Sequence, residues 1–235
     1  MTLLELLAEE PSRAALLLDV DGALAPIVPR PEEARVPDDT RQELRRLHSR
    51  YALVACISGR AGDDARRVVG VPELVYVGNH GLELDPRADE WRTRLAELLA
   101  GVKWPWLEDK GLSASFHYRN APDERAAHAE LEELAERARR AGFVARFGRK
   151  VLEVLPPLEA NKGTAVRRLL GEGRLQRALY AGDDTTDLDA FIAVAELELG
   201  VCVAVASPEG PAELIGAADL VVGSPAGLTA LLQKL

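Results

Sequence analysis

The stretch AALLLDVDG (residues 14–22) decides the fold, because an apolar run ends there in two aspartates and a glycine. The apolar run predicts a buried strand. In an open α/β sheet, ligands bind beyond the carboxyl ends of the strands, which is where Asp19 and Asp21 fall. Gly22 lets the chain turn tightly and present backbone N–H groups to an anion. A polar turn at a strand end, without function, is the alternative interpretation of this stretch alone.

The same alternation of short apolar runs and helical patterns continues on both sides of a middle segment. It is typical of a parallel sheet covered by helices on both faces. We therefore expect the α/β class with a Rossmann-like parallel sheet. The expected strands are 14–19, 52–57, 74–78, 177–184, 200–205 and 219–223, and the expected helices are 38–51, 161–173, 188–197 and one from about 226.

The middle segment follows a different pattern, of helix, strand, helix, strand and strand. The expected elements are a helix over 88–101, a strand over 113–119, a helix over 123–142 and a hairpin over 143–156 that turns at Gly148. An α+β module inserted into an α/β core is typical of a cap domain. The sequence thus predicts a core of residues 1–82 and 159–235 and a cap of residues 83–158.

Composition excludes several classes of protein. The net charge of −9 argues against a nucleic-acid binder, whose footprint would be basic. The sequence has no stretch of about 18 apolar residues, so no membrane span is expected. The acidic start MTLLELLAEEPSR does not resemble a signal peptide. Cys56 and Cys202 lie in apolar runs, as reduced core residues do. We expect a cytoplasmic protein, monomeric, with a small-molecule partner and neither nucleic acid nor membrane.

A second acidic cluster follows another predicted strand, at Gly182-Asp183-Asp184-Thr185-Thr186-Asp187. If the two strands are neighbours, their carboxylates converge, and such a group is costly unless a cation or a proton relieves it. Hard oxygen ligands favour Mg²⁺, which shares oxygens with a substrate phosphate. Capping of the next helix by Asp184 or Asp187 is the structural alternative, and both roles can coexist.

Two further segments suit an anion. Ser58-Gly59-Arg60 follows the second strand and offers a hydroxyl and backbone amides. Asn161-Lys162-Gly163 opens a helix and offers one positive charge. A nucleophile, a metal, a hydroxyl and a cation around the phosphoryl oxygens are what phosphoryl transfer requires.

This order of motifs resembles the haloacid dehalogenase superfamily. The resemblance implies that Asp19 attacks phosphorus, that Asp21 is the acid and base, and that Ser58 and Lys162 hold the phosphoryl oxygens. A general acid must hold a proton near neutral pH, so Asp21 needs a pKa well above about 3.9.

The resemblance also implies a set of metal ligands around the first aspartate. The implied ligands are Asp19, Asp21, Asp183, Asp184 and Asp187, and the resemblance leaves open which of Asp184 and Asp187 contacts the metal directly. At Asp21 a backbone oxygen, rather than the side chain, would contact the metal. Whether this oxygen belongs to Val20 is left open. Acid–base work is therefore the preferred role for the Asp21 side chain.

Longer segments resemble the trehalose-6-phosphate phosphatases within that superfamily, over about residues 14–205. They are ISGR (57–60), VGNHGLEL (77–84), LEDKGLSASFHYR (107–119), GRKVLEVLP (148–156), NKGTAV (161–166) and GDDTTDLDAF (182–191). The resemblance implies that the cap grips the sugar. The implied substrate-binding residues are Gly59, Arg60, His80, Glu108, Lys110, His117, Arg119, Lys150 and Glu153. An exposed charged sheet face and, for His80, a structural histidine are the alternatives.

One departure from the family concerns the nucleophile loop. Ala23 stands where the family usually has Thr, so a hydroxyl is missing there and the catalytic rate is left open. The leading hypothesis is hydrolysis of trehalose 6-phosphate with Mg²⁺. The alternatives are a phosphatase for another sugar phosphate such as glucosylglycerol phosphate, a sugar phosphomutase, and a non-catalytic sugar-phosphate-binding protein.

Overall fold

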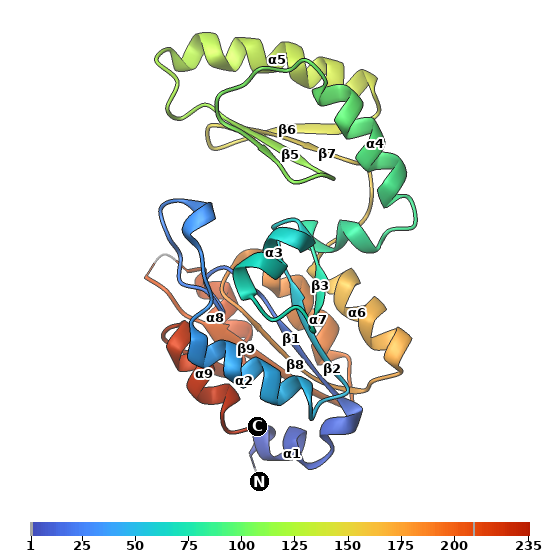
Figure 1. Ribbon diagram of the computed structural model, residues 1–235, viewed down its shortest axis with the longest axis vertical. Coiled ribbons are helices and arrows are strands. Elements are labelled where there is room, and N and C mark those ends of the chain that lie inside the picture. Colours follow the sequence, from blue (N-terminus) through green and yellow to red (C-terminus); the bar gives the residue numbers. More distant parts are fainter. Residues whose placement is uncertain (1, 209) are drawn as a thin grey trace. The chain divides into compact units, whose positions relative to one another are not determined.

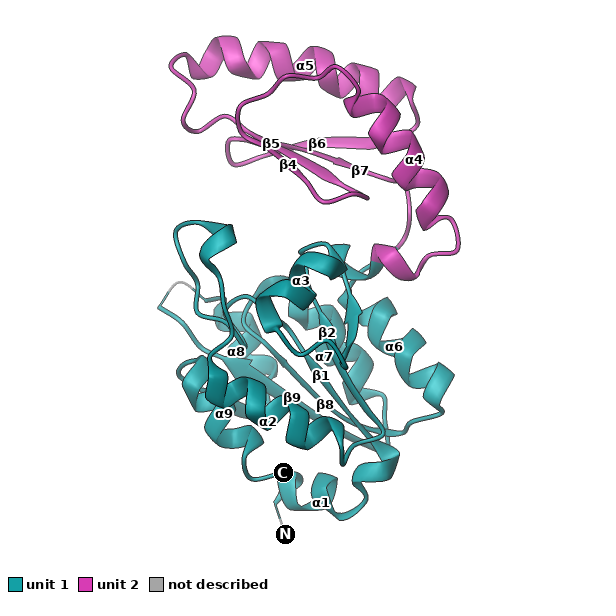
Figure 2. Ribbon diagram, in the orientation of Figure 1, with its two compact units in different colours: residues 1–81, 160–235 teal, residues 82–159 magenta. Residues whose placement is uncertain are grey.

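The chain divides into two compact units, which Figure 2 colours separately. The computed structural model describes residues 2–208 and 210–235. The larger unit comprises Met1–Gly81 and Ala160–Leu235, and the smaller comprises Leu82–Glu159. These limits differ by one residue from the boundaries expected from the sequence. That the smaller unit acts as a cap stays a prediction.

The larger unit contains a six-stranded sheet in the order β10-β9-β8-β1-β2-β3, with every neighbouring pair parallel (Figure 1). Its strands are β1 (Ala14–Leu18), β2 (Leu53–Ile57), β3 (Val75–Val77), β8 (Arg177–Gly182), β9 (Leu199–Val205) and β10 (Leu220–Val222). The chain leaves β1 in one direction toward β2 and β3 and returns on its other side as β8. The strand order therefore reverses at β1, where such sheets bind ligands. The predicted α/β class with a parallel sheet is confirmed.

Strand β1 lies at the centre because its side chains are apolar on both faces. All of its residues are buried, and it pairs with β2 on one side and β8 on the other. Parallel strands covered on both faces show such continuous apolar runs rather than alternation. Leu16 and Leu18 belong to the hydrophobic core of this unit.

Helices cover both faces of this sheet. They are α1 (Leu3–Glu9), α2 (Asp38–His48), α3 (Gly62–Val69), α6 (Lys162–Gly173), α7 (Leu188–Ala195), α8 (Ala212–Ala217) and α9 (Pro225–Leu232), with the 3₁₀ turns η1 (Pro11–Arg13), η2 (Pro31–Glu33), η3 (Asn79–Leu84) and η4 (Thr185–Asp187). A buried hydrogen bond of 2.8 Å between the hydroxyls of Thr40 and Thr229 joins α2 to α9. Helices α6 and α7 pack against each other. In the described part of the chain, every helix is too short or too polar to cross a bilayer.

The smaller unit is a four-stranded antiparallel sheet with two helices. Its strands follow the order β4-β5-β7-β6. The elements are α4 (Ala88–Leu99), β4 (Leu107–Asp109), β5 (Ala114–His117), α5 (Glu124–Arg140), β6 (Val144–Gly148) and β7 (Val151–Leu155). Along β7, Leu152 and Val154 are buried, whereas Val151, Glu153 and Leu155 are partly exposed. This alternation gives the sheet one apolar face and one polar face.

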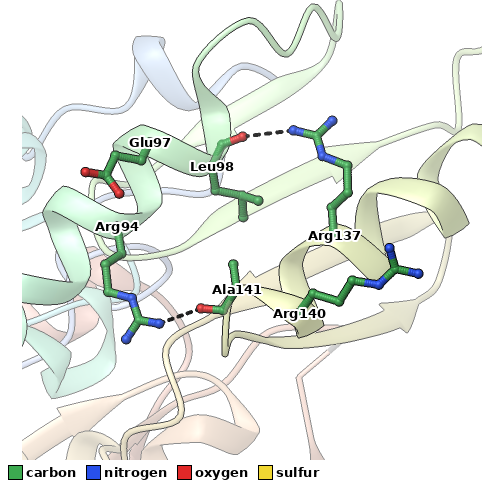
Figure 3. Close-up of a pocket in the computed structure, with 6 residues that line it drawn as sticks. All are labelled: Arg94, Glu97, Leu98, Arg137, Arg140 and Ala141. Atoms are coloured by element: carbon green, nitrogen blue, oxygen red, sulfur yellow. Dashed lines mark hydrogen bonds between the residues drawn. The ribbon is translucent and has the colours of Figure 1, made fainter.

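Two arginines tie α4 to α5, as Figure 3 shows. Arg94 donates to the carbonyl of Ala141 at 2.7 Å, and Arg137 donates to the carbonyl of Leu98 at 3.3 Å. Both carbonyls lie at helix C-terminal ends, where positive charge is favourable. Arg140 lines the same hollow, whose volume is about 560 Å³. Arg94 and Arg137 are thus accounted for by capping and by contact between the two helices.

Candidate active site

The acidic residues that the sequence singled out lie at the carboxyl ends of neighbouring strands. Asp19 directly follows β1 and continues the ladder, since its N–H donates to the carbonyl of Ala181 at 2.9 Å. Asp183 directly follows β8, the neighbour of β1. Ser58 directly follows β2 on the other side and is buried. The parallel sheet thus brings together groups that lie far apart in the sequence.

A buried chain of charges links Asp19 to Asp187 through Lys162. The Lys162 Nζ atom lies 2.8 Å from Asp19 Oδ1 and 2.7 Å from Asp187 Oδ1. The side chains of Lys162, Asp19 and Asp187 are only 3%, 7% and 0% exposed. Lys162 is the first residue of α6, whose start is fixed by a capping box between Asn161 and Thr164. The helix start therefore sets the position of the lysine.

Burial dominates the electrostatics of this chain. It raises the pKa of Asp19 well above the usual range, and the charge of Lys162 offsets only part of that rise. Burial would lower the pKa of Lys162, but the charges of Asp19 and Asp187 together outweigh it and raise that pKa. The pKa of Asp183 is raised to about 6, first by burial and then by the charge of Asp187. The cluster therefore holds more carboxylates than its single lysine can compensate.

Asp187 already has a full set of hydrogen-bond donors. Its Oδ1 atom accepts from Lys162 Nζ and, at 2.6 Å, from the Tyr180 hydroxyl. Its Oδ2 atom accepts from the backbone N–H groups of Asp183 and Asp184, both at 2.9 Å. A carboxylate offers about four acceptor positions, and here four donors fill them. Asp187 thus stabilises the conformation of the loop after β8. It also fixes the Lys162 ammonium on the side away from Asp19.

The Asp184 side chain is hydrogen-bonded to the backbone of the next turn. Its carboxylate accepts from the N–H of Thr185 at 2.7 Å and caps the turn η4. The acidic group whose oxygens come within 4.8 Å of one another consists of Asp19, Asp183 and Asp187. The capping alternative raised for Asp184 is therefore present in the structure, and Asp184 lies outside this group.

The backbone oxygen of Val20 is engaged in the turn that follows β1. It accepts from the N–H groups of Leu24 at 3.0 Å and Ala25 at 2.8 Å, and the Val20 side chain is fully buried in the hydrophobic core. A carbonyl oxygen has two lone pairs, and here two donors occupy them. The Val20 oxygen therefore shapes the loop around Asp21, and the metal contact left open at this position stays a prediction.

The donor set suits Mg²⁺. Asp19, Asp183 and Asp187 are carboxylates brought together at a buried site, and a divalent cation would relieve the repulsion that raises the pKa of Asp183. Hard oxygen ligands in small number are what Mg²⁺ takes, with water and substrate filling the rest. Since the oxygens of Asp187 are already occupied, Asp19 and Asp183 fit the role of protein ligands best.

Gly22 makes room for Asp183. Its φ of +80° lies in the left-handed region, and a Cβ atom here would come within 1.8 Å of Asp183 Oδ2. The backbone of the loop is held by a hydrogen bond of 2.8 Å from the Gly22 N–H to the carbonyl of Ala25. Ala23, beside it, is fully buried in the hydrophobic core. A side chain at position 22 would displace the Asp183 carboxylate.

We expect Gly22→Ala to abolish most phosphate release and to reduce the free energy of unfolding by about 1–2 kcal/mol or more, since an L-residue pays roughly that for left-handed backbone. Activity assays and urea denaturation measure both effects. Gly101→Ala is the matched control, because Gly101 has the same φ of +80° with nothing within 4 Å of its Cβ position. If both variants kept full activity, crowding of Asp183 would not matter.

Arg60 holds Asp21 and is itself held by Asp64. Its Nε and Nη2 atoms donate to the two Asp21 oxygens at 2.6 and 2.8 Å, and its Nη1 atom donates to Asp64 at 2.6 Å. Its backbone N–H donates to Ser58 Oγ at 3.1 Å. A two-pronged arginine pair fixes the carboxylate in one orientation. Asp64, four residues after Arg60, was not predicted as part of the site.

His80 packs against the Ser58-Gly59-Arg60 segment. A Cβ atom on Gly59 would lie 2.6 Å from His80 Nε2. The His80 and Asn79 N–H groups donate to the carbonyls of Ser58 and Arg60 at 2.9 and 2.7 Å. Both residues have left-handed φ values, of 54° and 52°, which cost about 1–3 kcal/mol each outside glycine. The fold thus holds the His80 ring over Gly59 at the cost of backbone strain.

The cap residues implied by the resemblance lie in the smaller unit. Glu108, Ser115, Glu153 and Arg146 are register neighbours across β4, β5, β7 and β6, so they form one row on the polar face. Glu108 Oε2 lies 3.4 Å from His117 Nε2 and 3.6 Å from Lys110 Nζ.

The other residues that the resemblance implies for sugar binding lie near the same strands. Glu153 pairs with Arg146 at 2.8 Å, and Lys150 with Glu124 at 2.5 Å, while Arg119 is exposed. The smaller unit therefore gathers Glu108, Lys110 and His117 into one polar cluster. Lys150 and Glu153 are each engaged with a partner that the sequence reasoning did not name.

Comparison with known proteins identifies the fold. A solved trehalose-6-phosphate phosphatase from Aspergillus fumigatus matches with a TM-score of 0.60 and 25% identity, covering 98% of this chain and 95% of that one. The fold is that of the haloacid dehalogenase superfamily, as the motifs implied. The trehalose-phosphatase family profile matches residues 17–105 and 97–213. This chain therefore belongs to the trehalose-phosphatase family.

Two curated relatives illustrate the range of proteins that this chain resembles. A probable trehalose-phosphate phosphatase of Sinorhizobium fredii is 33% identical over 86% of this chain and 81% of its own length. An uncharacterized glycosyl hydrolase of Mycobacterium tuberculosis is 35% identical over 81% of this chain. The matched region makes up only 16% of that longer protein.

Proposed function

We propose that this chain is a Mg²⁺-dependent phosphatase that hydrolyses trehalose 6-phosphate to trehalose and phosphate through an aspartyl-phosphate on Asp19. The observation that carries the proposal is the buried Asp19 carboxylate at the end of the central strand, 2.8 Å from Lys162 Nζ. Membership of the trehalose-phosphatase family supports the choice of sugar phosphate.

In the first half of the reaction, an Asp19 oxygen attacks phosphorus. The new Asp19 O–P bond forms as the bond from phosphorus to the sugar oxygen breaks, and that oxygen takes a proton from Asp21. Ser58 and Lys162 stabilise the phosphoryl oxygens. Two N–H groups of Lys162 are directed at Asp19 and Asp187, which leaves the third for a phosphoryl oxygen.

In the second half, water attacks phosphorus and Asp21 takes a proton from it. The O–P bond to Asp19 breaks, phosphate leaves and the carboxylate is restored. Arg60 donates one hydrogen bond to each oxygen of Asp21, which leaves about two of the four acceptor positions of this carboxylate for a proton. Arg60 is proposed to act on the substrate by holding the Asp21 carboxylate in one orientation.

Mg²⁺ is the proposed cofactor, held by Asp19 and Asp183. When bound, it neutralises negative charge on the phosphoryl group and its surrounding carboxylates. Asp187 would then act on the site through Lys162 and through the backbone of the loop after β8. The Asp21 side chain is proposed for acid–base work, in an orientation that is fixed by Arg60.

The polar face of the smaller unit is proposed to select the sugar. Hydroxyls of a disaccharide can accept from Lys110, His117, Arg119 and Lys150 and donate to Glu108 and Glu153. Glu108 is central to this set, because it contacts both His117 and Lys110.

We expect Glu108→Gln to raise KM for trehalose 6-phosphate roughly 10-fold or more, since hydrogen bonds to charged groups are worth about 1.5–3 kcal/mol. Hydrolysis of p-nitrophenyl phosphate, which has no sugar, should be unchanged. Glu136→Gln is the matched control, because Glu136 pairs with Arg139 on the exposed side of α5. Equal effects on both substrates would argue that Glu108 supports the fold rather than the sugar.

A panel of phosphate esters, assayed for released phosphate with and without Mg²⁺, tests the proposed function. We expect trehalose 6-phosphate to be preferred and EDTA to abolish its hydrolysis. Preference for glucosylglycerol phosphate or another ester would replace the substrate, and an isomeric sugar phosphate would indicate a mutase. Binding without turnover of any ester would indicate a sugar-phosphate-binding protein, and turnover unaffected by EDTA would exclude the metal.

A further inference from the structure

Tyr180 is a buried hydroxyl at a position where packing requires only an apolar ring. It lies on β8 with 0% exposure, beside Leu17 of β1 and Cys202 of β9 in register. Its ring packs edge-on against Phe191 of α7, with centroids 6.0 Å apart. Phenylalanine would satisfy all of these contacts. The hydroxyl therefore needs a reason of its own, since a buried polar group is costly unless it is hydrogen-bonded.

That reason is Asp187. The Tyr180 hydroxyl donates to Asp187 Oδ1 at 2.6 Å, and the same oxygen accepts from Lys162 Nζ at 2.7 Å. The Lys162 ammonium in turn lies 2.8 Å from Asp19 Oδ1. A continuous line of buried contacts thus runs from Tyr180 through Asp187 and Lys162 to Asp19. Its far end is on strand β8, which is hydrogen-bonded on both sides within the sheet.

Within this series of contacts, the Oδ1 atom of Asp187 is the atom that can move. Its Oδ2 atom is fixed by two backbone N–H groups of the loop after β8. Rotation of the carboxylate about that anchor would carry Oδ1 away from Lys162. The hydroxyl of Tyr180 blocks this rotation, because it holds Oδ1 from the sheet side. In a water-poor interior such a charge-assisted bond is strong and directional.

We propose that Tyr180 is a positioning residue: its hydroxyl locks Asp187 so that Lys162 is held against Asp19 with one N–H directed at the phosphoryl group. The inference rests on the proposed function for its effect on turnover, whereas its effect on the Lys162 ammonium depends on the geometry alone. Tyr180 touches neither substrate nor metal and acts through Asp187.

Tyr180→Phe in the full chain tests the proposal. The change keeps the ring and removes only the hydroxyl. We expect kcat to fall roughly 10- to 100-fold while KM stays within about threefold, because the loss falls on transition-state stabilisation. Tyr76→Phe is the matched control: the Tyr76 hydroxyl donates to the Val71 carbonyl at 2.7 Å in the same unit. That variant should lose stability with kcat unchanged.

A double variant separates positioning from packing. If Tyr180 acts through Asp187, adding Tyr180→Phe to Asp187→Asn should reduce the residual single-turnover rate less than about twofold further. Independent, multiplicative losses would overturn the proposal. So would a kcat for Tyr180→Phe equal to that of Tyr76→Phe.

A second readout does not depend on activity. Buried lysine ammonium groups that exchange slowly give ¹⁵N-correlated NMR signals, and the Lys162 signal should exchange with water at least about tenfold faster in Tyr180→Phe than in the wild type and in Tyr76→Phe. An unchanged exchange rate would overturn the positioning role. If the wild type released no phosphate from any ester, the proposed function would fail, and this measurement would still decide the role of Tyr180.

Discussion

Asp19→Asn is expected to reduce phosphate release from trehalose 6-phosphate by roughly 10⁴-fold or more, the size of loss seen when an enzyme's nucleophile is removed. Asparagine has nearly the shape of aspartate, but its amide cannot form an acyl phosphate that water cleaves. Acid-quenched wild-type enzyme should carry a phosphoryl group on Asp19, and the variant should carry none. Mass spectrometry of the quenched protein and a phosphate assay measure the two effects.

The control for this variant is Asp63→Asn, an exposed aspartate in the first turn of α3. It makes the same chemical change in the same unit and should leave turnover within about twofold. Circular dichroism checks that Asp19→Asn is folded, since its carboxylate is replaced next to Lys162. Sustained phosphate release by a folded Asp19→Asn would show that the nucleophile is a different group.

The parts of the fold that follow from local pattern could be predicted from sequence. Strands β1, β2, β8 and β9 are apolar on both faces and lie between polar loops, so their runs are visible without any tertiary information. The position of an acid at the end of two such runs then predicts convergence, because parallel strands end at one edge. Family resemblance added the roles that pattern alone left open.

Short elements were missed for physical reasons. Strand β4 has three residues and pairs with one neighbour, so its length and alternation give no signal. Helix α8 has six residues, and only Leu214 is buried. Helix α1 was also not predicted, although Thr2 and Glu5 have the spacing of a capping box, which indicates a helix start. Helix α3, which begins at Gly62 shortly after the Ser58 segment, was also not predicted from the sequence.

Partners inside the site could not be predicted, because they depend on which groups meet across the fold. Tyr180 lies within an apolar strand and looks like core in the sequence, yet its hydroxyl contacts Asp187. Nothing in the order of residues indicates that Arg60 pairs with Asp21 across 39 positions. One signal was available: Asp64 lies four residues after Arg60, a spacing that favours an ion pair beside a helix start.

Backbone oxygens are harder still to assign from sequence, because every residue has one. The contact left open at Val20 illustrates this, since only the folded loop shows that its carbonyl accepts from Leu24 and Ala25. Such bonds depend on the path of the turn and not on the type of side chain.

Lys162→Met is the variant expected to affect stability most. Lys162 lies between the carboxylates of Asp19 and Asp187, with its side chain 3% exposed. Its removal leaves two buried carboxylates without their cation, and breaking a buried pair in this way costs about 3–5 kcal/mol. Urea denaturation without Mg²⁺ should show this loss, and phosphate release should fall below about 1% of wild type because a phosphoryl contact is lost.

Arg167→Met on the same helix provides the comparison. Arg167 pairs with Glu196 at 2.7 Å, but both side chains are about half exposed, and such pairs contribute about 0–1 kcal/mol. Adding Asp187→Asn to Lys162→Met should recover part of the lost stability, since one stranded charge is removed. Mg²⁺ should recover a further part if Asp19 and Asp183 bind it, because the cation would then compensate the carboxylate that lost its lysine. Equal stability losses in Lys162→Met and Arg167→Met would contradict the central place given to this lysine.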